Sequence, residues 1–271
     1  MTAPGTIKTI DSSQNPDFKL LRDLVGASRA RREHQTAWLE GERLCQAFIE
    51  HQPKLAPILV VSEGTPLNRL PAKIRVAAKE VWMLNRRLYA QITQVETSIG
   101  WGLLIPMSPA QPRGQGDDIV VLDRLQDPGN AGSILRSAAA AGARAVWCVQ
   151  GTVDLWSPKV LRSGMGAHFV IGIQQDLQVQ EVISACRQEA IGMLATGNDA
   201  RAASLFDATL RLDRPVAWIF GQEGSGVAAE FMAAASQVAI PQAAHIESLN
   251  VAAAAAVCLF ESRRRKLERM G

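Results

Sequence analysis

The sequence predicts an α/β protein of two domains, the second built on a mainly parallel sheet, and three observations lead to this prediction. The chain has 271 residues, which is long for one domain and comfortable for two. Residues 106–118 hold three prolines and two glycines with almost nothing to bury, as in a linker. Beyond them, short apolar runs alternate with helical stretches, the pattern of parallel strands covered by helices on both faces. We therefore expect a smaller α/β domain at 1–105, a linker at 106–117 and a second domain at 118–271.

The first domain is expected to combine a helix with short strands. Residues 37–50 have a helical pattern, whereas 56–62 and 81–84 are short apolar runs bounded by proline or charge, as in strands. Residues 1–105 are also basic, with 14 Lys plus Arg against 10 Asp plus Glu. The most closely grouped cations are Arg22, Arg29, Arg31, Arg32 and Arg43, and a second basic group closes the chain at 263–269. Either group could bind phosphate or form a solvated helix face, and the charges alone leave both open.

The second domain is expected to contain six strands and three long helices. The short apolar runs that predict strands are 118–122, 145–149, 168–173, 191–196, 215–220 and 236–240. The stretches that predict helices are about 131–141, 177–189 and 249–268. Such alternation favours a parallel sheet, because each connection between parallel strands crosses over one face.

Composition excludes several classes of protein. Apolar residues make up 47% and charged residues 20%, with mean hydropathy near zero, which suits neither a disordered nor a fibrous chain. The longest strongly apolar run, residues 251–260, is too short to cross a bilayer. Residues 1–10 lack the features of a secretory signal, so we expect a cytoplasmic protein. The cysteines form no Cys-x-x-Cys pair and no histidines stand at ligand spacing, so neither disulfides nor a metal site is expected.

A first polar constellation follows the strand expected at 118–122. Pro128 and Gly129 turn the chain into the next helix. Helical side chains lean toward the N-terminus, so Arg136 is expected to point at the Asn130 loop, beside the carboxyl ends of the strands. Ligands bind at that edge in open α/β sheets, although Arg136 could equally be an ordinary surface residue.

A second constellation is an apolar strand that runs into three glycines around one acid. The glycines are Gly221, Gly224 and Gly226, and the acid is Glu223. Glycine permits positive φ and lets a ligand approach the backbone closely. The spacing is not the G-x-G-x-x-G of a dinucleotide site. A ligand loop and a simple tight turn with a solvent-facing Glu223 both remain open.

A third constellation precedes the long helix at the end of the chain. It contains the pair Ile240–Pro241 and, a few residues later, Ser248 and Asn250. Either polar residue could simply cap the helix, and the alanines at 252–256 could simply be a closely packed face.

Together and in this order, the three segments resemble the SpoU/TrmH family of the SPOUT methyltransferase superfamily. Its motifs are Asn-x-Gly-x-x-x-Arg, then Phe-Gly-x-Glu-x-x-Gly, then Ile-Pro-Met leading to Glu-Ser-Leu-Asn-Val. The matching residues here are Asn130, Gly132 and Arg136; Phe220, Gly221, Glu223 and Gly226; and Ile240, Pro241 and residues 247–251. Residues 13–19 and 38–44 look like the substrate-binding domain that many members carry. Two positions depart from the pattern, since Gln242 replaces a common Met and Ala244 a common Gly.

The resemblance implies a catalytic domain with a deep trefoil knot and a pocket for S-adenosylmethionine. Residues 221–260 would thread a loop and form that pocket, and true knots are too rare for composition to suggest one. Contacts to the cofactor are implied for Gly221, Ile240 and Leu249, with Thr196 and Gly197 completing the pocket.

The same resemblance implies transfer of a methyl group to a ribose 2′-hydroxyl of RNA. Arg136 would organise the RNA phosphate and the 2′-oxygen, but an arginine resists deprotonation, so the proton acceptor stays open. Asn130, Glu223, Ser248 and Asn250 are expected to position the reacting groups, because alignment alone can supply several orders of magnitude of rate.

The partners implied are RNA and a second copy of the chain. The first domain would dock RNA through Arg29, Arg31, Arg32 and Arg43, with ribosomal RNA expected ahead of transfer RNA. Two rival interpretations are a non-catalytic RNA-binding protein that kept the fold and a Rossmann-type oxidoreductase. The second lacks its glycine fingerprint here.

Overall fold

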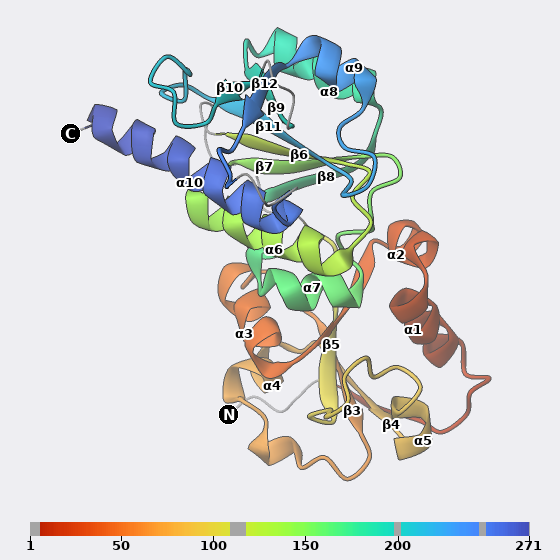
Figure 1. Ribbon diagram of the computed structural model, residues 1–271. Helices are drawn as coiled ribbons and strands as arrows, with labels where there is room; N and C mark the ends of the chain where they lie inside the picture. Colours follow the sequence, from red (N-terminus) through yellow and green to blue (C-terminus); the bar gives the residue numbers. More distant parts are fainter. Residues whose placement is uncertain (1–5, 109–117, 198–201, 244–247, 271) are drawn as a thin grey trace. The chain divides into compact units, whose positions relative to one another are not determined.

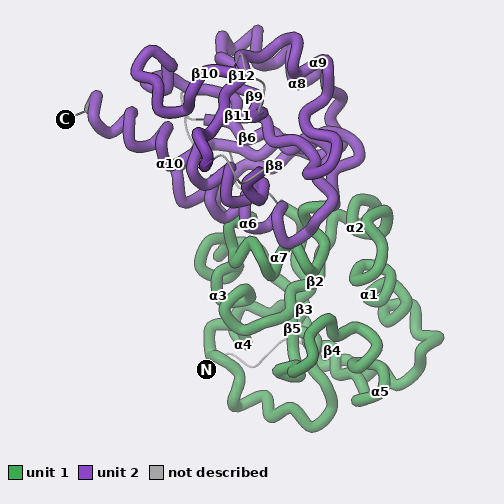
Figure 2. Tube along the Cα trace, viewed as in Figure 1, with its two compact units in different colours: residues 1–108, 154–169 green, residues 109–153, 170–271 purple. Residues whose placement is uncertain are grey.

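The computed structural model describes residues 6–108, 118–197, 202–243 and 248–270. The chain forms two compact units (Figure 2). Unit 1 comprises Met1–Ser108 together with Asp154–Phe169, and unit 2 comprises Pro109–Val153 together with Val170–Gly271. Residues 154–169, which the sequence-based division places in the second domain, therefore pack with unit 1. Most of the expected linker, 109–117, lies outside the described residues.

Unit 1 is built on a five-stranded sheet in the order β1-β4-β3-β5-β2. The first three strands in this order are parallel, and β5 runs antiparallel to both β3 and β2. The strands are β1 (Ile7–Ile10), β2 (Thr36–Glu40), β3 (Ile58–Ser62), β4 (Glu80–Leu84) and β5 (Trp101–Pro106). The helices are α1 (Pro16–Gly26), α2 (Ser28–His34), α3 (Glu42–His51), α4 (Ala72–Ala77), α5 (Arg86–Tyr89) and α7 (Pro158–Gly164), with 3-10 turns at Leu67–Arg69 and Ala167–Phe169.

The helix expected over 37–50 is wrong in its first part. Residues 37–40 belong to β2 and are all buried, and α3 begins only at Glu42. Gly41 separates the two elements with a φ of +114°, a conformation that glycine adopts without strain. A short continuous apolar run does not distinguish a buried strand from a buried helix, so only the break at Gly41 could have signalled the change.

The segment 154–169 is fastened to unit 1 by a buried ion pair. Arg31 Nε donates to Asp154 Oδ2 at 2.6 Å, and the two side chains are only 4% and 7% exposed. Arg31 Nη1 also donates to the carbonyl oxygen of Leu24 at 2.6 Å. Phe169 packs edge-on against Phe48, with ring centroids 5.4 Å apart. These hydrogen bonds occupy the guanidinium of Arg31, which therefore stabilises the fold of unit 1.

Unit 2 contains a seven-stranded sheet in the order β10-β12-β9-β11-β6-β7-β8, and every described pairing is parallel. The α/β prediction with a mainly parallel sheet is therefore confirmed. The strands are β6 (Ile119–Asp123), β7 (Ala145–Val149), β8 (Gly172–Leu177), β9 (Gly192–Thr196), β10 (Ala203–Ser204), β11 (Val216–Gly221) and β12 (Ser236–Ala239). The helices are α6 (Pro128–Ala141), α8 (Val179–Gln188), α9 (Ala229–Ala234) and α10 (Val251–Met270).

Helices cover both faces of this sheet (Figure 1). Helices α8 and α9 lie side by side on one face, and α6 and α10 lie side by side on the other. Val182 and Phe231 come from the first pair and belong to one hydrophobic core with Ile119 and Val121 of β6. Burial on both faces explains why these strands are continuous apolar runs rather than alternating ones.

One predicted strand, 168–173, is misplaced. Residues 167–169 form a 3-10 turn of unit 1, and β8 begins only at Gly172. His168 and Phe169 are buried inside unit 1. The apolar run that predicted a strand therefore begins with a buried turn. No helix among the described residues combines the length and apolar character needed to cross a membrane.

Helix α10 is held to the rest of unit 2 by polar contacts along its length. Trp218 Nε1 donates to Ser262 Oγ at 3.1 Å, and Lys266 Nζ pairs with the buried Asp118. Asp118 Oδ1 also accepts the backbone N–H of Val216 at 2.9 Å, which fixes the start of β11. These contacts join the last helix to the central strands.

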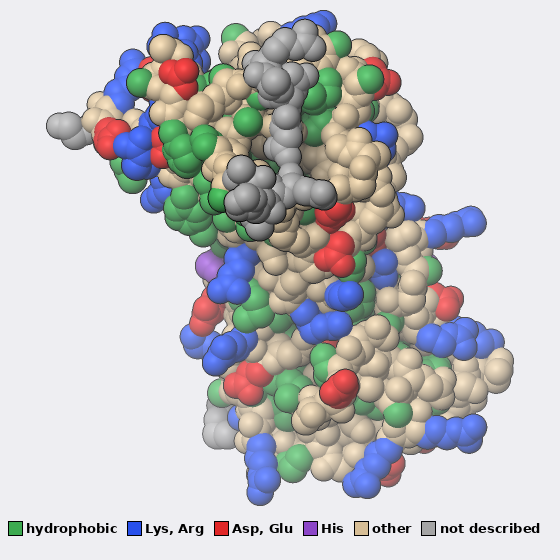
Figure 3. Space-filling view, in the orientation of Figure 1, with side chains coloured by type: hydrophobic (Ala, Val, Ile, Leu, Met, Phe, Trp, Pro, Cys, Tyr) green, Lys and Arg blue, Asp and Glu red, His purple; other side chains and the backbone are tan. Residues whose placement is uncertain are grey.

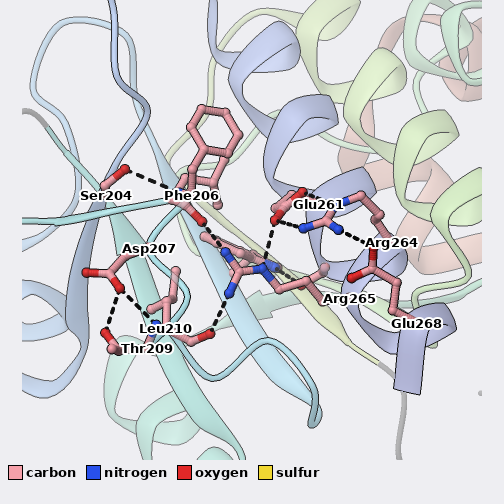
Figure 4. A network of polar contacts seen from close by, with 12 residues as sticks. Ser204, Phe206, Asp207, Thr209, Leu210, Glu261, Arg264, Arg265 and Glu268 are labelled. Atoms are coloured by element: carbon pink, nitrogen blue, oxygen red, sulfur yellow. Dashed lines mark hydrogen bonds and ion pairs between the residues drawn. The ribbon is translucent and has the colours of Figure 1, made fainter. Parts of the chain in front are cut away.

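The basic group at the end of the chain is largely engaged within unit 2. Arg264 and Arg265 both pair with Glu261, and their hydrogen bonds lower the pKa of Glu261 to about 2. Arg265 also donates to the carbonyl oxygens of Leu205 and Leu210 at 3.2 Å, which ties α10 to the segment after β10 (Figure 4). Of the two interpretations of this cluster, the structure favours a helix face that makes structural contacts over a phosphate site.

Candidate functional site

A hollow of about 560 Å³ lies at the carboxyl ends of β9, β11 and β12 in unit 2. We call it the strand-end hollow. Its walls are residues 196–197 at the end of β9, residues 221–227 from the end of β11 into the following loop, Val238, Ile240 and Gln242 around the end of β12, and residues 248–251 with Ala254 at the start of α10. All five residues expected to contact a cofactor lie in these walls, namely Thr196, Gly197, Gly221, Ile240 and Leu249. Its position agrees with the rule that open α/β sheets bind ligands beyond the carboxyl ends of their strands.

The loop after β11 is a tight turn that only glycine can close. A Cβ added to Gly221 would lie 2.3 Å from both the carbonyl carbon and oxygen of Gly226, which is far inside contact distance. Gly226 has a φ of +67°, and its N–H donates to the carbonyl oxygen of Gln222 at 2.8 Å. The turn therefore packs backbone against backbone, which places the loop's main chain in the wall of the hollow.

Asn130 connects all three motif segments. Its Nδ2 donates to Glu223 Oε1 at 2.5 Å, across 93 residues of sequence, and its Oδ1 accepts from Asn250 Nδ2 at 3.0 Å, across 120 residues. Asp127 fixes the position of Asn130, because Asp127 Oδ1 accepts the Asn130 N–H at 2.7 Å at the start of α6. Glu223, Ser248 and Asn250 also line the hollow. Four of the five expected catalytic residues thus meet at one place.

Asn250 serves two purposes at once. Its Oδ1 accepts the N–H groups of Ala252 at 3.0 Å and Ala253 at 3.3 Å, so it caps α10. Its Nδ2 is left for Asn130. The capping and site interpretations of this residue are therefore compatible. Glu247 and Ala244, the neighbours that the motif comparison also named, lie outside the described residues.

Arg136 is exposed on α6 and is not among the residues that line the hollow. Within the described ranges no residue forms a hydrogen bond or ion pair with it. A guanidinium in this state is available to an outside acceptor such as a phosphate.

Asp123 helps to position the loop after β11, and the sequence patterns did not predict this role. It ends β6, is completely buried, and lies beside Gly221 in the register of β6 with β11. Its Oδ2 accepts the N–H of Ala228 at 2.6 Å, and Arg124 Nε donates to its Oδ1 at 2.8 Å. The carboxylate therefore holds the far end of the loop 222–228 to β6, the strand that pairs with β11, from which the loop starts. The only signal in the sequence is an acid directly after an apolar run.

The arginines expected to dock RNA differ in their exposure. Arg29, Arg32 and Arg43 are exposed, whereas Arg31 is 3% exposed and engaged by Asp154. On the face shown in Figure 3, Lys and Arg side chains of unit 1 are interspersed with acidic ones instead of forming one patch. Among the described residues, no group of three or more His, Cys, Asp or Glu could hold a metal ion.

Comparison with known proteins identifies a family. The model of the SpoU rRNA methylase family matches residues 117–260, more than half of the chain. A tRNA/rRNA methyltransferase of Synechocystis, itself uncharacterized, is 33% identical over 268 residues, covering 96% of this chain and 95% of the relative. The 23S rRNA (guanosine(2553)-2′-O)-methyltransferase of Bacillus subtilis is 28% identical over 258 residues, covering 95% of this chain and all of the relative.

Solved structures agree with the sequence comparison. The AdoMet-bound rRNA methyltransferase of Sinorhizobium meliloti superposes with a TM-score of 0.80 at 29% identity, covering 96% of this chain and 98% of that chain. A crystal structure of an RNA 2′-O ribose methyltransferase gives a TM-score of 0.76 at 30% identity and covers 96% of this chain and all of that chain. The matched segment contains the three motifs and the strand-end hollow, and this chain is therefore a member of the SpoU rRNA methylase family.

Proposed function

We propose that this chain transfers the methyl group of S-adenosylmethionine to a ribose 2′-hydroxyl of ribosomal RNA. The observation that carries the proposal is that Asn130 forms hydrogen bonds with both Glu223 and Asn250 at the rim of the strand-end hollow. The 23S rRNA 2′-O-methyltransferase of Bacillus subtilis aligns with nearly the whole chain, which favours ribosomal over transfer RNA.

The hollow suits a small molecule with a flat apolar part and a charged part. Its volume of about 560 Å³ falls in the range of ordinary ligand pockets, about 300–1,000 Å³. Val238, Ile240 and Leu249 offer apolar contacts for an adenine ring, and the main chain of residues 221–227 offers hydrogen-bonding groups. Glu223 supplies a carboxylate to a ligand that carries positive charge. The AdoMet-bound relative supports the same assignment.

The chain's own residues would position the reaction. When bound, S-adenosylmethionine supplies a methyl group on a positively charged sulfur, which is open to attack by oxygen. Asn130 fixes Glu223 and Asn250 at the rim, so these groups need no rearrangement when the ribose arrives. Arg136 would hold the RNA phosphate next to the 2′-oxygen through its charged hydrogen-bond donors.

Domain roles and assembly complete the proposal. Residues 1–105 together with 154–169 would bind the substrate RNA, with 106–117 as linker, and the rest of 118–271 would be the catalytic domain, in which residues 221–260 would form a trefoil knot. Arg29, Arg32 and Arg43 are exposed and remain RNA contacts in this proposal, whereas the burial of Arg31 removes it. Val257 and Phe260 of α10 are 37% and 48% exposed, which supports a homodimer that covers them. The site of action would be the cytoplasm.

The decisive experiment measures methyl transfer with matched variants on one helix. Arg136→Ala should bind S-adenosylmethionine as the parent does but lose nearly all transfer to ribosomal RNA, whereas Ser133→Ala, also exposed on α6, should keep it. Mapping of 2′-O-methyl groups in total RNA from cells with and without the protein then identifies the nucleotide. If transfer by Arg136→Ala stays within a few-fold of the parent, the role given to Arg136 is wrong.

One observation favours a second candidate, a non-catalytic RNA-binding protein of the same fold. Gln242 lines the hollow at the position where the family commonly has Met. Calorimetry with S-adenosylmethionine separates the candidates, because a protein that only binds RNA gives no heat with the donor.

A further inference from the structure

Unit 1 has a hollow of its own, of about 330 Å³, which the proposed reaction does not use. We call it the front hollow. It lies where β2 ends and α3 begins, and α7 and the loop before β5 complete its walls. Every residue that lines it belongs to unit 1.

One wall of the front hollow is apolar and open to water. Ile99 is 41% exposed and Met165 is 43% exposed, and both line the hollow beside Val95 and Leu44. Scattered exposed apolar side chains need no explanation, but two that line the same concave site favour a ligand with an apolar face.

The lining of the front hollow also includes hydrogen-bond donors that lack acceptors. Helix α3 starts after Gly41, which has no side chain to cap it, and no described residue accepts from the N–H groups of residues 42–44. Arg162 Nη1 is buried and also has no hydrogen-bond partner among the described residues. Burial lowers the pKa of Arg162, and the nearby charge of Glu40 opposes this shift.

The nearby Glu40 does not satisfy Arg162. Its carboxylate is buried and accepts from Thr93 Oγ1 at 2.5 Å, from the N–H of Gln94 at 2.8 Å and from Ser98 Oγ at 3.0 Å. These bonds fix the Glu40 side chain, which lines the hollow, and leave Arg162 available to an acceptor on a ligand. Arg43, exposed at the rim, adds a second positive charge.

We propose that the front hollow binds one unpaired nucleotide of the RNA substrate. The base would lie against Ile99 and Met165, and a phosphate oxygen would accept from the Arg162 guanidinium and the first turn of α3. Proteins that read RNA sequence commonly take unstacked bases into such sites, and helix N-termini and arginines are suited to phosphate. The Glu42 carboxylate also lines the hollow and can accept from a base amino group, which favours adenine, guanine and cytosine over uracil. This inference rests on the proposed function, since it names a contact of that RNA.

The first test uses the full chain and 5′-nucleoside monophosphates, followed by methyl NMR. AMP, GMP or CMP should shift the methyl resonances of Ile99 and Met165 with saturation, and UMP should shift them less. Val76, which is 67% exposed in unit 1 and does not line the front hollow, serves as the unaffected control. Absence of shifts with all four nucleotides overturns the proposal.

The second test is kinetic and separates this site from the donor site. The double variant Ile99→Ala, Met165→Ala changes only exposed side chains, so it should fold. We expect it to raise the KM for ribosomal RNA at least tenfold and to leave the affinity for S-adenosylmethionine unchanged. Arg162→Gln should act in the same direction, and Val76→Ala should have no effect. A KM within twofold of the parent in the double variant contradicts the site. If the parent transfers no methyl group at all, the proposed function fails, while the nucleotide titration still decides whether the front hollow binds.

Discussion

Asn250 Nδ2 donates to Asn130 Oδ1 at 3.0 Å, although 120 residues separate the two in the chain. At the same time, Asn130 Nδ2 donates to Glu223 Oε1. One amide therefore sets the distance between the first turn of α6, the glycine loop and the start of α10.

Asn130→Asp should disrupt this arrangement electrostatically. The new carboxylate would replace the donor to Glu223 Oε1 and place two negative charges at hydrogen-bond distance. We expect kcat/KM for methyl transfer to fall about 100-fold, equivalent to about 2.7 kcal/mol. Asn130→Ser, which is smaller but uncharged, should retain more activity than the Asp variant. Equal activity of the two variants would show that charge at this position is irrelevant.

Gly221→Ala and Gly224→Ala form a matched pair in one loop. A Cβ at Gly221 would collide with the main chain of Gly226, whereas a Cβ at Gly224 meets nothing within 4 Å. The first substitution should therefore distort the wall of the strand-end hollow and weaken donor binding at least tenfold. The second should leave it within about twofold. Isothermal titration with S-adenosylmethionine measures both, and comparable affinities would mean that the turn does not shape the donor site.

Asp123→Asn should loosen the loop from its far end. The carboxylate is fully buried and accepts from Ala228 N–H and from Arg124, so its charge contributes to both bonds. We expect a loss of roughly 2–3 kcal/mol in the free energy of unfolding. Faster hydrogen exchange at the Ala228 amide should accompany it. Arg124→Gln is the control, because Arg124 is 41% exposed at its side chain and its loss should cost less. Unchanged exchange at Ala228 would contradict the tether.

His168 should make unit 1 sensitive to mild acid. Burial lowers the pKa of His168 to about 4, and its Nε2 lies 2.8 Å from the carbonyl oxygen of Leu155. The unfolded chain binds this proton near pH 6.5, so between pH 6.5 and pH 4 the unfolded state takes up more protons than the folded state. Stability is full above that window and falls as the pH drops through it, by about 2 kcal/mol at pH 5.

Urea unfolding at neutral and mildly acidic pH tests this expectation. His168→Gln has no group that titrates in the window, so its free energy of unfolding should decrease less between the two conditions. The same pH dependence in parent and variant would assign the effect to other groups.

Local sequence patterns predicted most elements of unit 2, because its central strands are apolar runs buried on both faces, but they missed β10 and α9, which have only two and six residues. They failed at 37–40 and 168–173, where buried apolar runs carry no periodicity. The three motifs could be recognised, but not the role of Asp123, since a single acid after a strand is common. The burial of Arg31 was also invisible, because its partner Asp154 lies 123 residues away.

The bond between Arg31 and Asp154 limits how the front half of this protein can be separated from the rest. The chain passes from unit 1 to unit 2, returns at residue 154 and leaves again after residue 169. A fragment cut after residue 108 would keep Arg31 in its buried position without its carboxylate and would uncover Phe48. Exchange of front halves between relatives, in the laboratory or in evolution, would have to carry this short second piece along with the first.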